Sequence, residues 1–172
     1  MKKIIQLLVC VCMFSFMAAQ ENFEVSTLRI GPFKMFMDKT EAEKLSGMKL
    51  KLSDGESKNT VKYNGEIILV DIYERYIDEK NPNVLSVYGI STKSKKFKTK
   101  SGIGVGSTKD EVINAYKNYS SFSAYPAWND KGEKLKNESY FILNDDDAGT
   151  MLSFRFLNNI VTEMSVYMNE GC

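Results

Sequence analysis

The segment 97–116, FKTKSGIGVGSTKDEVINAY, constrains the fold most, because it predicts a strand, a glycine-rich turn and a helix in succession. Thr108 is the candidate N-cap, and Glu111 three residues later completes a capping box, the pattern that opens many helices. Gly104 and Gly106 allow the tight turn that precedes this helix. Their spacing matches neither a phosphate-binding loop nor a dinucleotide-binding fingerprint, so we interpret the turn as structural and expect no cofactor.

A second short helix is predicted over TEAEKLSG, with Thr40 as its N-cap, Glu43 as the capping-box acid and Gly47 just after its end. A hairpin follows it, because Asn64 and Gly65 both tolerate the positive φ of a tight turn. This half of the chain therefore also predicts a helix that leads into strands.

The final third predicts three more strands, over 139–144, 150–156 and 160–168. Along the middle one, large apolar residues alternate with smaller or polar ones, which is the pattern of a strand with one face packed inward. The fold class that fits these elements is α+β, an antiparallel sheet with short helices packed on one face.

The two capping boxes suggest an internal repeat of residues 24–91 and 92–168. Thr40 and Thr108 each begin a unit in which a helix is followed by hairpin strands. The glycine turn has no good counterpart before the first helix. A duplicated helix-and-sheet unit is therefore a hypothesis that the sequence alone leaves open.

The N-terminus predicts a removable signal peptide over residues 1–19. Two lysines precede an apolar run of fourteen residues, and Ala18 and Ala19 supply the small residues that a signal peptidase needs. We expect residues 20–172 to form one α+β domain in the periplasm or outside the cell, with no transmembrane segment after signal removal. A membrane anchor or a lipoprotein is the alternative. Cys172 is then free or paired with another molecule.

Charge and histidine content exclude several classes of function. Without the two leader lysines, 21 basic residues face 22 acidic ones, and this nearly neutral balance disfavours a nucleic-acid partner. The chain contains no histidine, which excludes histidine-based catalytic triads and histidine-ligated zinc. No spacing of carboxylates or serines singles out a catalytic pair, so we expect no enzyme.

The strings GIGVGSTKDEVINAY and LSFRFLNNIVTEMSV resemble small exported bacterial proteins of the BamE-like and beta-lactamase-inhibitor-protein-like group. In that group a phrase of the type G-I-x-V-G-x-[ST]-x-x-E-V opens a helix, and an F-x-F-x-[ND]-[NG]-x-V hairpin closes the sheet. The resemblance covers about residues 96–168 and implies a protein that binds other proteins or supports the cell envelope. The residues that match are Gly102, Ile103, Val105, Gly106, Thr108, Glu111, Val112, Phe154, Phe156, Asn158, Asn159 and Val161.

The acidic stretch from Asn144 to Gly149 invites comparison with a calcium-binding loop. Hard cations take several oxygen ligands from one loop, and glycine stands at the sixth position as in EF-hands. However, Arg155 occupies the position where such a loop needs a bidentate glutamate. We therefore favour a solvated hairpin turn and expect no metal site.

Five lysines gather around a single phenylalanine between two predicted elements. They could contact an anionic surface such as lipid head groups or an acidic protein. The alternative, which we favour, is an edge strand that lysines protect from unwanted pairing. The lysines are Lys93, Lys95, Lys96, Lys98 and Lys100.

Four aromatic residues, Tyr119, Phe122, Tyr125 and Trp128, recur every three residues after the second helix. A proline within the segment argues against a continuous helix. We interpret the segment as a loop whose rings either pack onto the core or bind a partner protein, and Trp128 is the best candidate for an exposed anchor.

Three functional hypotheses follow. The leading one is an exported, non-catalytic module, protein-binding or inhibitor-like, that binds another exported or envelope protein through its sheet or its aromatic segment. The second is an envelope structural or assembly protein that uses the lysine cluster against an anionic surface. The third is a hydrolase that works with carboxylates and without histidine.

Overall fold

The computed structural model describes residues 22–53, 58–76 and 84–169. Short helices and mostly antiparallel strands make a sheet-rich α+β fold, as the sequence predicts. The predicted signal peptide over 1–19 and Cys172 lie outside the described residues. No helix in the described part of the chain is long and apolar enough to cross a membrane.

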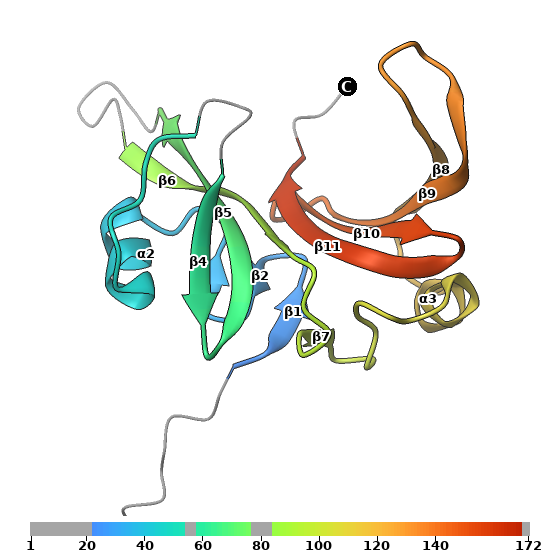
Figure 1. The fold of residues 1–172 in the computed structure, drawn as a ribbon, viewed down its shortest axis with the longest axis horizontal. Coiled ribbons are helices and arrows are strands. Elements are labelled where there is room, and N and C mark those ends of the chain that lie inside the picture. Colours follow the sequence, from blue (N-terminus) through green and yellow to red (C-terminus); the bar gives the residue numbers. More distant parts are fainter. Residues whose placement is uncertain (1–21, 54–57, 77–83, 170–172) are drawn as a thin grey trace, which may run out of the picture.

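Two sheets organise the molecule (Figure 1). The large sheet has the strand order β4-β5-β6-β11-β10-β9-β8, and its neighbouring strands are antiparallel. The small sheet has the order β3-β2-β1-β7, in which β1 and β7 run parallel. The elements are β1 (Glu24–Ser26), β2 (Arg29–Ile30), β3 (Phe33–Lys34), α2 (Lys39–Ser46), β4 (Asn59–Tyr63), β5 (Glu66–Arg75), β6 (Val84–Thr92), β7 (Lys98–Thr99), α3 (Lys109–Tyr116), β8 (Phe122–Trp128), β9 (Lys134–Asp145), β10 (Thr150–Leu157) and β11 (Ile160–Met168).

The core lies against one face of the large sheet. Strand register aligns a row of buried apolar residues across five strands, and each such side chain stabilises the fold by about 1.5–3 kcal/mol. Phe33 of the small sheet, Ala42 of α2 and Val112 of α3 belong to the same cluster. The two helices and both sheets therefore share one core. The row consists of Val70, Ile90, Val166, Leu152 and Leu143.

The start of α3 confirms the predicted capping box. The Thr108 hydroxyl accepts a hydrogen bond from the Glu111 N–H at 3.2 Å, and the Glu111 carboxylate accepts one from the Thr108 N–H at 2.7 Å. Gly106 has a φ of 93°. A Cβ on Gly104 would lie 2.5 Å from the carbonyl oxygen of Phe97. Both glycines are thus required by the backbone itself.

The predicted capping box of α2 is wrong. The helix has Asp38 as its N-cap, without a side-chain capping bond, so Thr40 lies inside the first turn. The Glu43 carboxylate accepts instead from the Leu50 N–H at 3.0 Å and forms an ion pair with Lys49 at 2.9 Å. Glu43 also pairs with Lys39 at 3.0 Å, so its carboxylate is bound by side chains and by the Leu50 N–H and does not cap the helix. Gly47 ends the helix in the left-handed conformation, as predicted.

The turn before α3 has a counterpart before α2, which the sequence does not predict. In the first half the Phe36 N–H donates to the Val87 carbonyl at 2.8 Å, and the Val87 N–H donates to the Met37 carbonyl at 2.9 Å. In the second half Gly106, Val161 and Ser107 make the same pair of bonds, both at 2.9 Å. Phe36 adopts a φ of 62°, so the sequence signal of glycine is missing although the backbone turn is the same.

A β-bulge also recurs at the same place in each half. Between β5 and β6 the register shifts just before the pair Ile72–Val87. Between β10 and β11 it shifts just before the pair Phe156–Val161. The valine that follows each bulge, Val87 or Val161, also hydrogen-bonds the turn before the helix of its half. The two halves therefore share a backbone arrangement that local sequence does not reveal.

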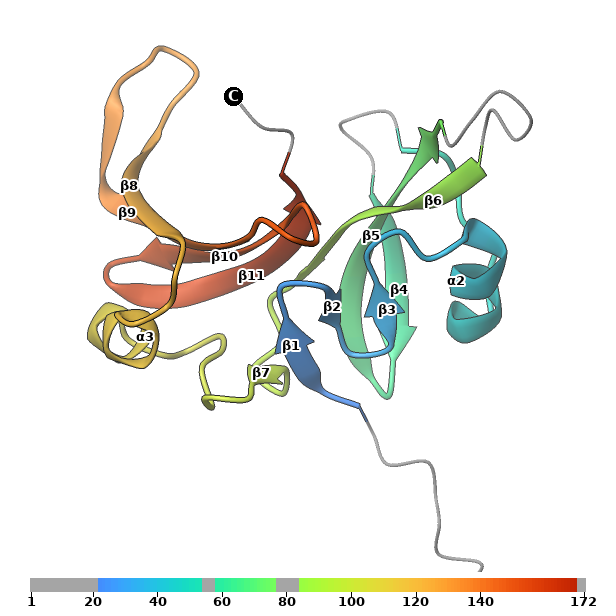
Figure 2. The same ribbon diagram turned by 180° about the vertical axis from the view of Figure 1, so that it is seen from behind.

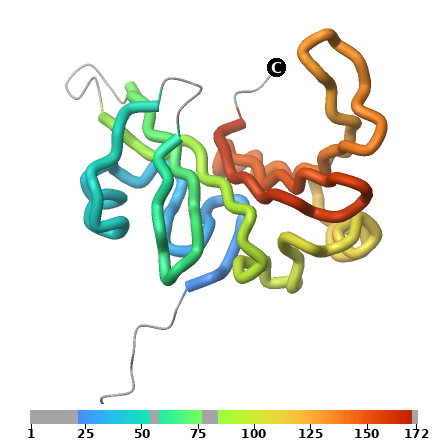
Figure 3. The backbone as a smooth tube through the Cα atoms, viewed as in Figure 1, coloured from blue at the N-terminus to red at the C-terminus, as the bar shows by residue number. Residues whose placement is uncertain are grey.

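The hairpin of β8 and β9 is longer than the sequence predicts. Of the segment interpreted as an aromatic loop, residues 122–128 form strand β8 and Tyr119 precedes it, and β9 begins at Lys134 rather than at residue 139. Pro126 is compatible with this strand because β8 lies at the edge of the sheet, where no further ladder bond is needed. Figure 3 shows the hairpin, in orange, extending away from the rest of the sheet.

Candidate functional site

The candidate site is the face of the large sheet opposite the core, here called the open face. Register aligns a second row across all seven strands, one residue along from the apolar row, and most of its side chains are small. Figure 2 shows the small sheet in front of β4 and β5, on the core side. Ile67 is 50% exposed and Tyr125 44% exposed, so water reaches the open face. The small-residue row consists of Thr60, Leu69, Ser91, Ser165, Ser153, Ile142 and Ser123.

Larger side chains flank this row on both sides. Because they are paired across neighbouring strands, their positions are set by the sheet and not by loops. Asp71, Gly89, Tyr167 and Met151 follow one another on one side, and Glu163, Arg155, Tyr140 and Tyr125 on the other. The open face therefore has a central row of mostly small side chains, and the flanking positions are aromatic or charged except at Gly89 and Met151.

Three tyrosines on the open face, Tyr125, Tyr140 and Tyr167, interact with one another. The rings of Tyr125 and Tyr140 lie 5.7 Å apart. Burial raises the pKa of Tyr167 and of Tyr125, and charge interactions with the neighbouring tyrosines add to this effect. Both phenols therefore stay protonated at neutral pH.

A pocket of about 470 Å³ lies at the β5–β6 end of the open face. The rings of Tyr73 and Tyr88 lie 6.1 Å apart on its wall. Behind them, Phe36 packs edge-on against Tyr88 at 5.9 Å. Asp71 brings a carboxylate to the same pocket and pairs with Lys58 at 2.9 Å.

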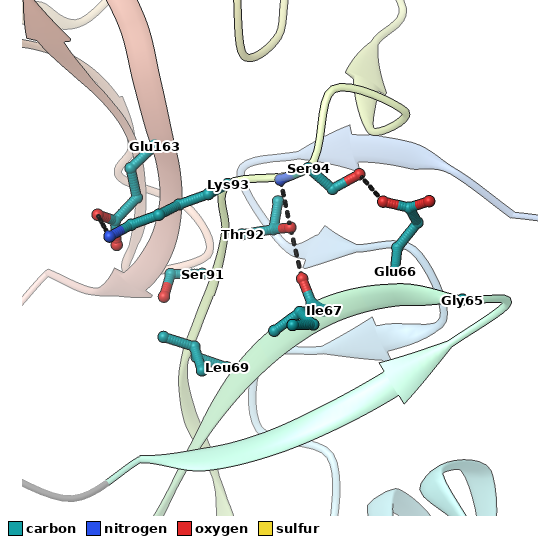
Figure 4. Close-up of a pocket in the computed structure, with 9 residues that line it drawn as sticks. All are labelled: Gly65, Glu66, Ile67, Leu69, Ser91, Thr92, Lys93, Ser94 and Glu163. Carbon is teal, nitrogen blue, oxygen red and sulfur yellow. Dashed lines mark hydrogen bonds and ion pairs between the residues drawn. The ribbon is translucent and has the colours of Figure 1, made fainter.

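A second pocket, of about 410 Å³, lies on the other side of the small-residue row (Figure 4). Ile67 and Leu69 give it an apolar floor. At its rim, Lys93 points toward Glu163, with nitrogen and oxygen 3.8 Å apart. The pocket therefore combines apolar surface with a weak, exposed ion pair.

Glu66, which lines this second pocket, is bonded to two neighbouring side chains. Its carboxylate accepts from the Ser94 hydroxyl at 2.6 Å and pairs with Lys96 at 2.9 Å. The Ser94 bond and then the Lys96 bond lower the pKa of Glu66. A carboxyl group that is ionised at neutral pH is a poor general acid, so this pocket gives little support to the hydrolase hypothesis.

The four predicted aromatic residues do not form one patch, because a strand sends alternate residues to opposite faces. Of the four, Tyr125 joins the tyrosines of the open face. Phe122 stacks on Phe141 of the core side at 5.2 Å, and Tyr119 packs against Tyr116 at 6.5 Å. Trp128 is 55% exposed on the hairpin and lies under the ammonium group of Lys134 at 5.3 Å.

The predicted lysine cluster surrounds the edge strand β7. Phe97 and Thr99 are buried, and Lys98 between them is half-buried. Besides the pairs of Lys93 and Lys96 described above, Lys98 donates to the Val105 carbonyl at 3.2 Å. Lys95 and Lys100 are exposed. The alternation is that of an edge strand with lysines on its outer side.

The acidic stretch forms the turn between β9 and β10. Asp145 accepts from the Thr27 hydroxyl at 2.8 Å and from the Ala148 N–H at 3.1 Å, and Gly149 has a φ of 64°. Among the described residues, no three carboxylate or cysteine side chains gather closely enough to hold a metal ion.

Four open-face tyrosines, Tyr73, Tyr88, Tyr140 and Tyr167, are not among the sequence-predicted site residues. Tyr140 and Tyr167 each lie next to buried residues of a strand, so period-two alternation could have placed them outward. Their convergence depends on strand register, which joins residues far apart in sequence. Comparisons with models of known families, with curated proteins and with solved structures find no match for this chain.

Proposed function

We propose that the chain is an exported, non-catalytic module that binds another exported or envelope protein through its open face. The observation that supports this most is the group of partly exposed tyrosines on a face opposite the core, in which the rings of Tyr125 and Tyr140 lie 5.7 Å apart. In this proposal both helices pack on the core face, as predicted from the sequence, and leave the open face free for a partner.

The chemistry of the face suits a protein partner. Tyrosine rings bury much area while only two torsions lose freedom, which is why they are enriched at binding sites. The rings of Tyr125 and Tyr140 pack against each other on paired strands before a partner arrives, so less entropy is lost on binding. Seven strands about 4.8 Å apart and about eight residues long offer on the order of 700 Å², close to the ~800 Å² that each partner buries in a standard interface.

The alternative of an anionic surface bound by the lysine cluster has less support. Lys93, Lys96 and Lys98 already have acceptors within the chain, so contact with lipid or an acidic protein would compete with these bonds. Exposed ion pairs are weak, so the competition is modest but opposes the contact.

Affinity capture from the native envelope, followed by quantitative mass spectrometry, tests the proposal. Tyr140→Ala removes an open-face ring, and Leu28→Ala removes an exposed side chain in the small sheet's β1–β2 turn as a matched control. We expect a partner that the unmodified chain and Leu28→Ala both retain and that Tyr140→Ala loses. Hot-spot rings contribute about 2 kcal/mol or more, which is roughly a thirty-fold loss of affinity.

Thermal unfolding of each variant separates binding from stability. The proposal requires that Tyr140→Ala unfolds near the temperature of the unmodified chain. Equal capture of the partner by the unmodified chain, Leu28→Ala and Tyr140→Ala would refute binding through the open face. Loss of the partner with Trp128→Ala alone would place the interaction on the hairpin instead.

A further inference from the structure

The pocket at the β5–β6 end of the open face combines aromatic rings with carboxylates. Tyr73, Tyr88 and Tyr167 line it together with Asp71 and Glu74. An aromatic ring carries negative charge on its face, and a positive group within about 6 Å of the ring centre is attracted to it. Carboxylates at the same pocket add to this attraction.

We propose that this pocket binds an organic ammonium group, and that its occupant is a lysine side chain of the partner protein. The pocket opens on the face through which we propose that the partner binds, so the identity of the occupant rests on the proposed function. The affinity of the pocket for an ammonium group does not rest on the proposed function, because it follows from the side chains that line the pocket.

Backbone constraints keep the pocket open. A Cβ on Gly89 would lie 2.5 Å from a carboxylate oxygen of Asp71, so any larger residue there would displace this carboxylate. Phe36 holds a left-handed φ of 62° and packs behind Tyr88. Bulky residues rarely adopt this conformation, and such strain is concentrated at functional sites. The guanidinium of Arg75 lies over the Phe36 ring at 5.5 Å.

The second half of the chain lacks these pocket residues at the matching positions. Where the first bulge has Tyr88, between Val87 and Gly89, the second has Thr162 between Val161 and Glu163. The turn residue that matches Phe36 is Gly106. The aromatic residues of the pocket are therefore specific to the first half and are not needed for the shared backbone arrangement.

Charge differs between the halves in the same way. Asp71 pairs with Gly89 across the strands just before the first bulge, and Arg155 occupies the matching place before the second. Arg155 is satisfied by a bond to Glu138 at 2.6 Å. The first half presents a carboxylate paired with Lys58, whereas the second half presents a cation paired with Glu138.

Lys58 already shows how Asp71 receives an ammonium group. Its nitrogen lies 2.9 Å from the carboxylate, and its side chain is 44% exposed at the edge of the sheet. An incoming lysine would share or displace this weak pair. Removal of Lys58 should therefore strengthen ammonium binding, a gain that a merely structural role for Asp71 does not predict.

Titration of the mature chain with two small amides tests the proposal. Nα-acetyl-lysine methylamide carries the ammonium group, and Nα-acetyl-norleucine methylamide is its uncharged counterpart. We expect the lysine amide to shift the NMR signals of the Tyr73 and Tyr88 rings and of the Met151 methyl group, and to bind at least about five-fold more tightly than the norleucine amide. Equal binding of the two amides, or no shift, would overturn the proposal.

Variants connect the binding to the pocket. Tyr73→Leu and Asp71→Asn should each weaken binding of the lysine amide by about three-fold or more, and Lys58→Met should tighten it. Phe122→Leu, an exposed ring on the opposite face, is the control and should change nothing. Unaltered affinity in Tyr73→Leu and Asp71→Asn would place the amide elsewhere, and tetramethylammonium bound in preference to the lysine amide would refute the lysine assignment. Amide binding without partner capture would refute the proposed function alone.

Discussion

Replacing either of two glycines in the turn before α3 by alanine should lower the stability of the protein, for a different physical reason at each position. At Gly106 the space is open, since the nearest atom to a new Cβ is Lys95 Cε at 3.9 Å, but the φ of 93° disfavours any side chain. We expect Gly106→Ala to lower the free energy of unfolding by about 1–2 kcal/mol, the penalty of a left-handed residue.

At Gly104 there is no space for a side chain. A new Cβ would lie 2.5 Å from the Phe97 carbonyl oxygen and 2.6 Å from Lys98 Cδ, and the oxygen belongs to the backbone. The turn must open by roughly 1 Å to restore ordinary contact, which disturbs the bond from the Thr99 N–H to the Ile103 carbonyl. Overpacking at about 1–3 kcal/mol plus one lost bond at about 1 kcal/mol gives an expected loss of about 2–4 kcal/mol.

Asparagine distinguishes the two mechanisms, because it tolerates positive φ but needs more room than alanine. Gly106→Asn should recover part of the loss seen in Gly106→Ala, whereas Gly104→Asn should be at least as unstable as Gly104→Ala. Urea unfolding gives the free energies, and in a domain of this size 1 kcal/mol corresponds to about 2–4 °C in Tm. If asparagine restored stability at position 104 and not at 106, the reasoning would be wrong.

Three further predictions concern the helices and the core. Thr108→Ala should lower the unfolding free energy by about 1 kcal/mol in urea titrations, while Thr40→Ala, which loses no capping bond, should change it by less than about 0.5 kcal/mol; equal effects would contradict the assigned caps. The bonds from Lys49, Lys39 and Leu50 lower the pKa of Glu43 to about 2 from 4.5, so its contribution to stability is full above about pH 4.5 and is lost as the pH falls toward 2. Glu43→Gln should therefore flatten the pH dependence of Tm in that window, and an unchanged slope would exclude this role. Phe154→Ala, in the centre of the core, should lower the unfolding free energy by about 3–5 kcal/mol, measured in the same way.

Local patterns predicted the parts of the fold that neighbouring residues determine. The capping box at Thr108 and the end of α2 at Gly47 depend on contacts within a few residues, and the strand at 150–156 is indicated by the alternation of its own side chains. The cap at Thr40 failed although its pattern is equally good, because the helix begins at Lys39 and Glu43 bonds Lys39, Lys49 and Leu50 instead. A sequence pattern cannot rank such competing contacts.

The site was less predictable than the fold. Tyr125 was a candidate from the sequence, but Tyr167, whose pKa it raises, belongs to strand β11 and shares the open face with it only through the order of the strands. The segment around Pro126 looks like a loop, because proline is rare in strands except at edges. Which strand lies at the edge is a property of the whole sheet.

The pairing of β1 with β7 has a consequence for the rate of folding. Val25 lies beside Thr99, and Met164 pairs with Thr92, so in each pair a large part of the chain separates the two residues. Contacts this distant must close large loops before they yield any stabilisation, and domains rich in them fold in milliseconds to seconds. We therefore expect this chain to refold slowly for its size.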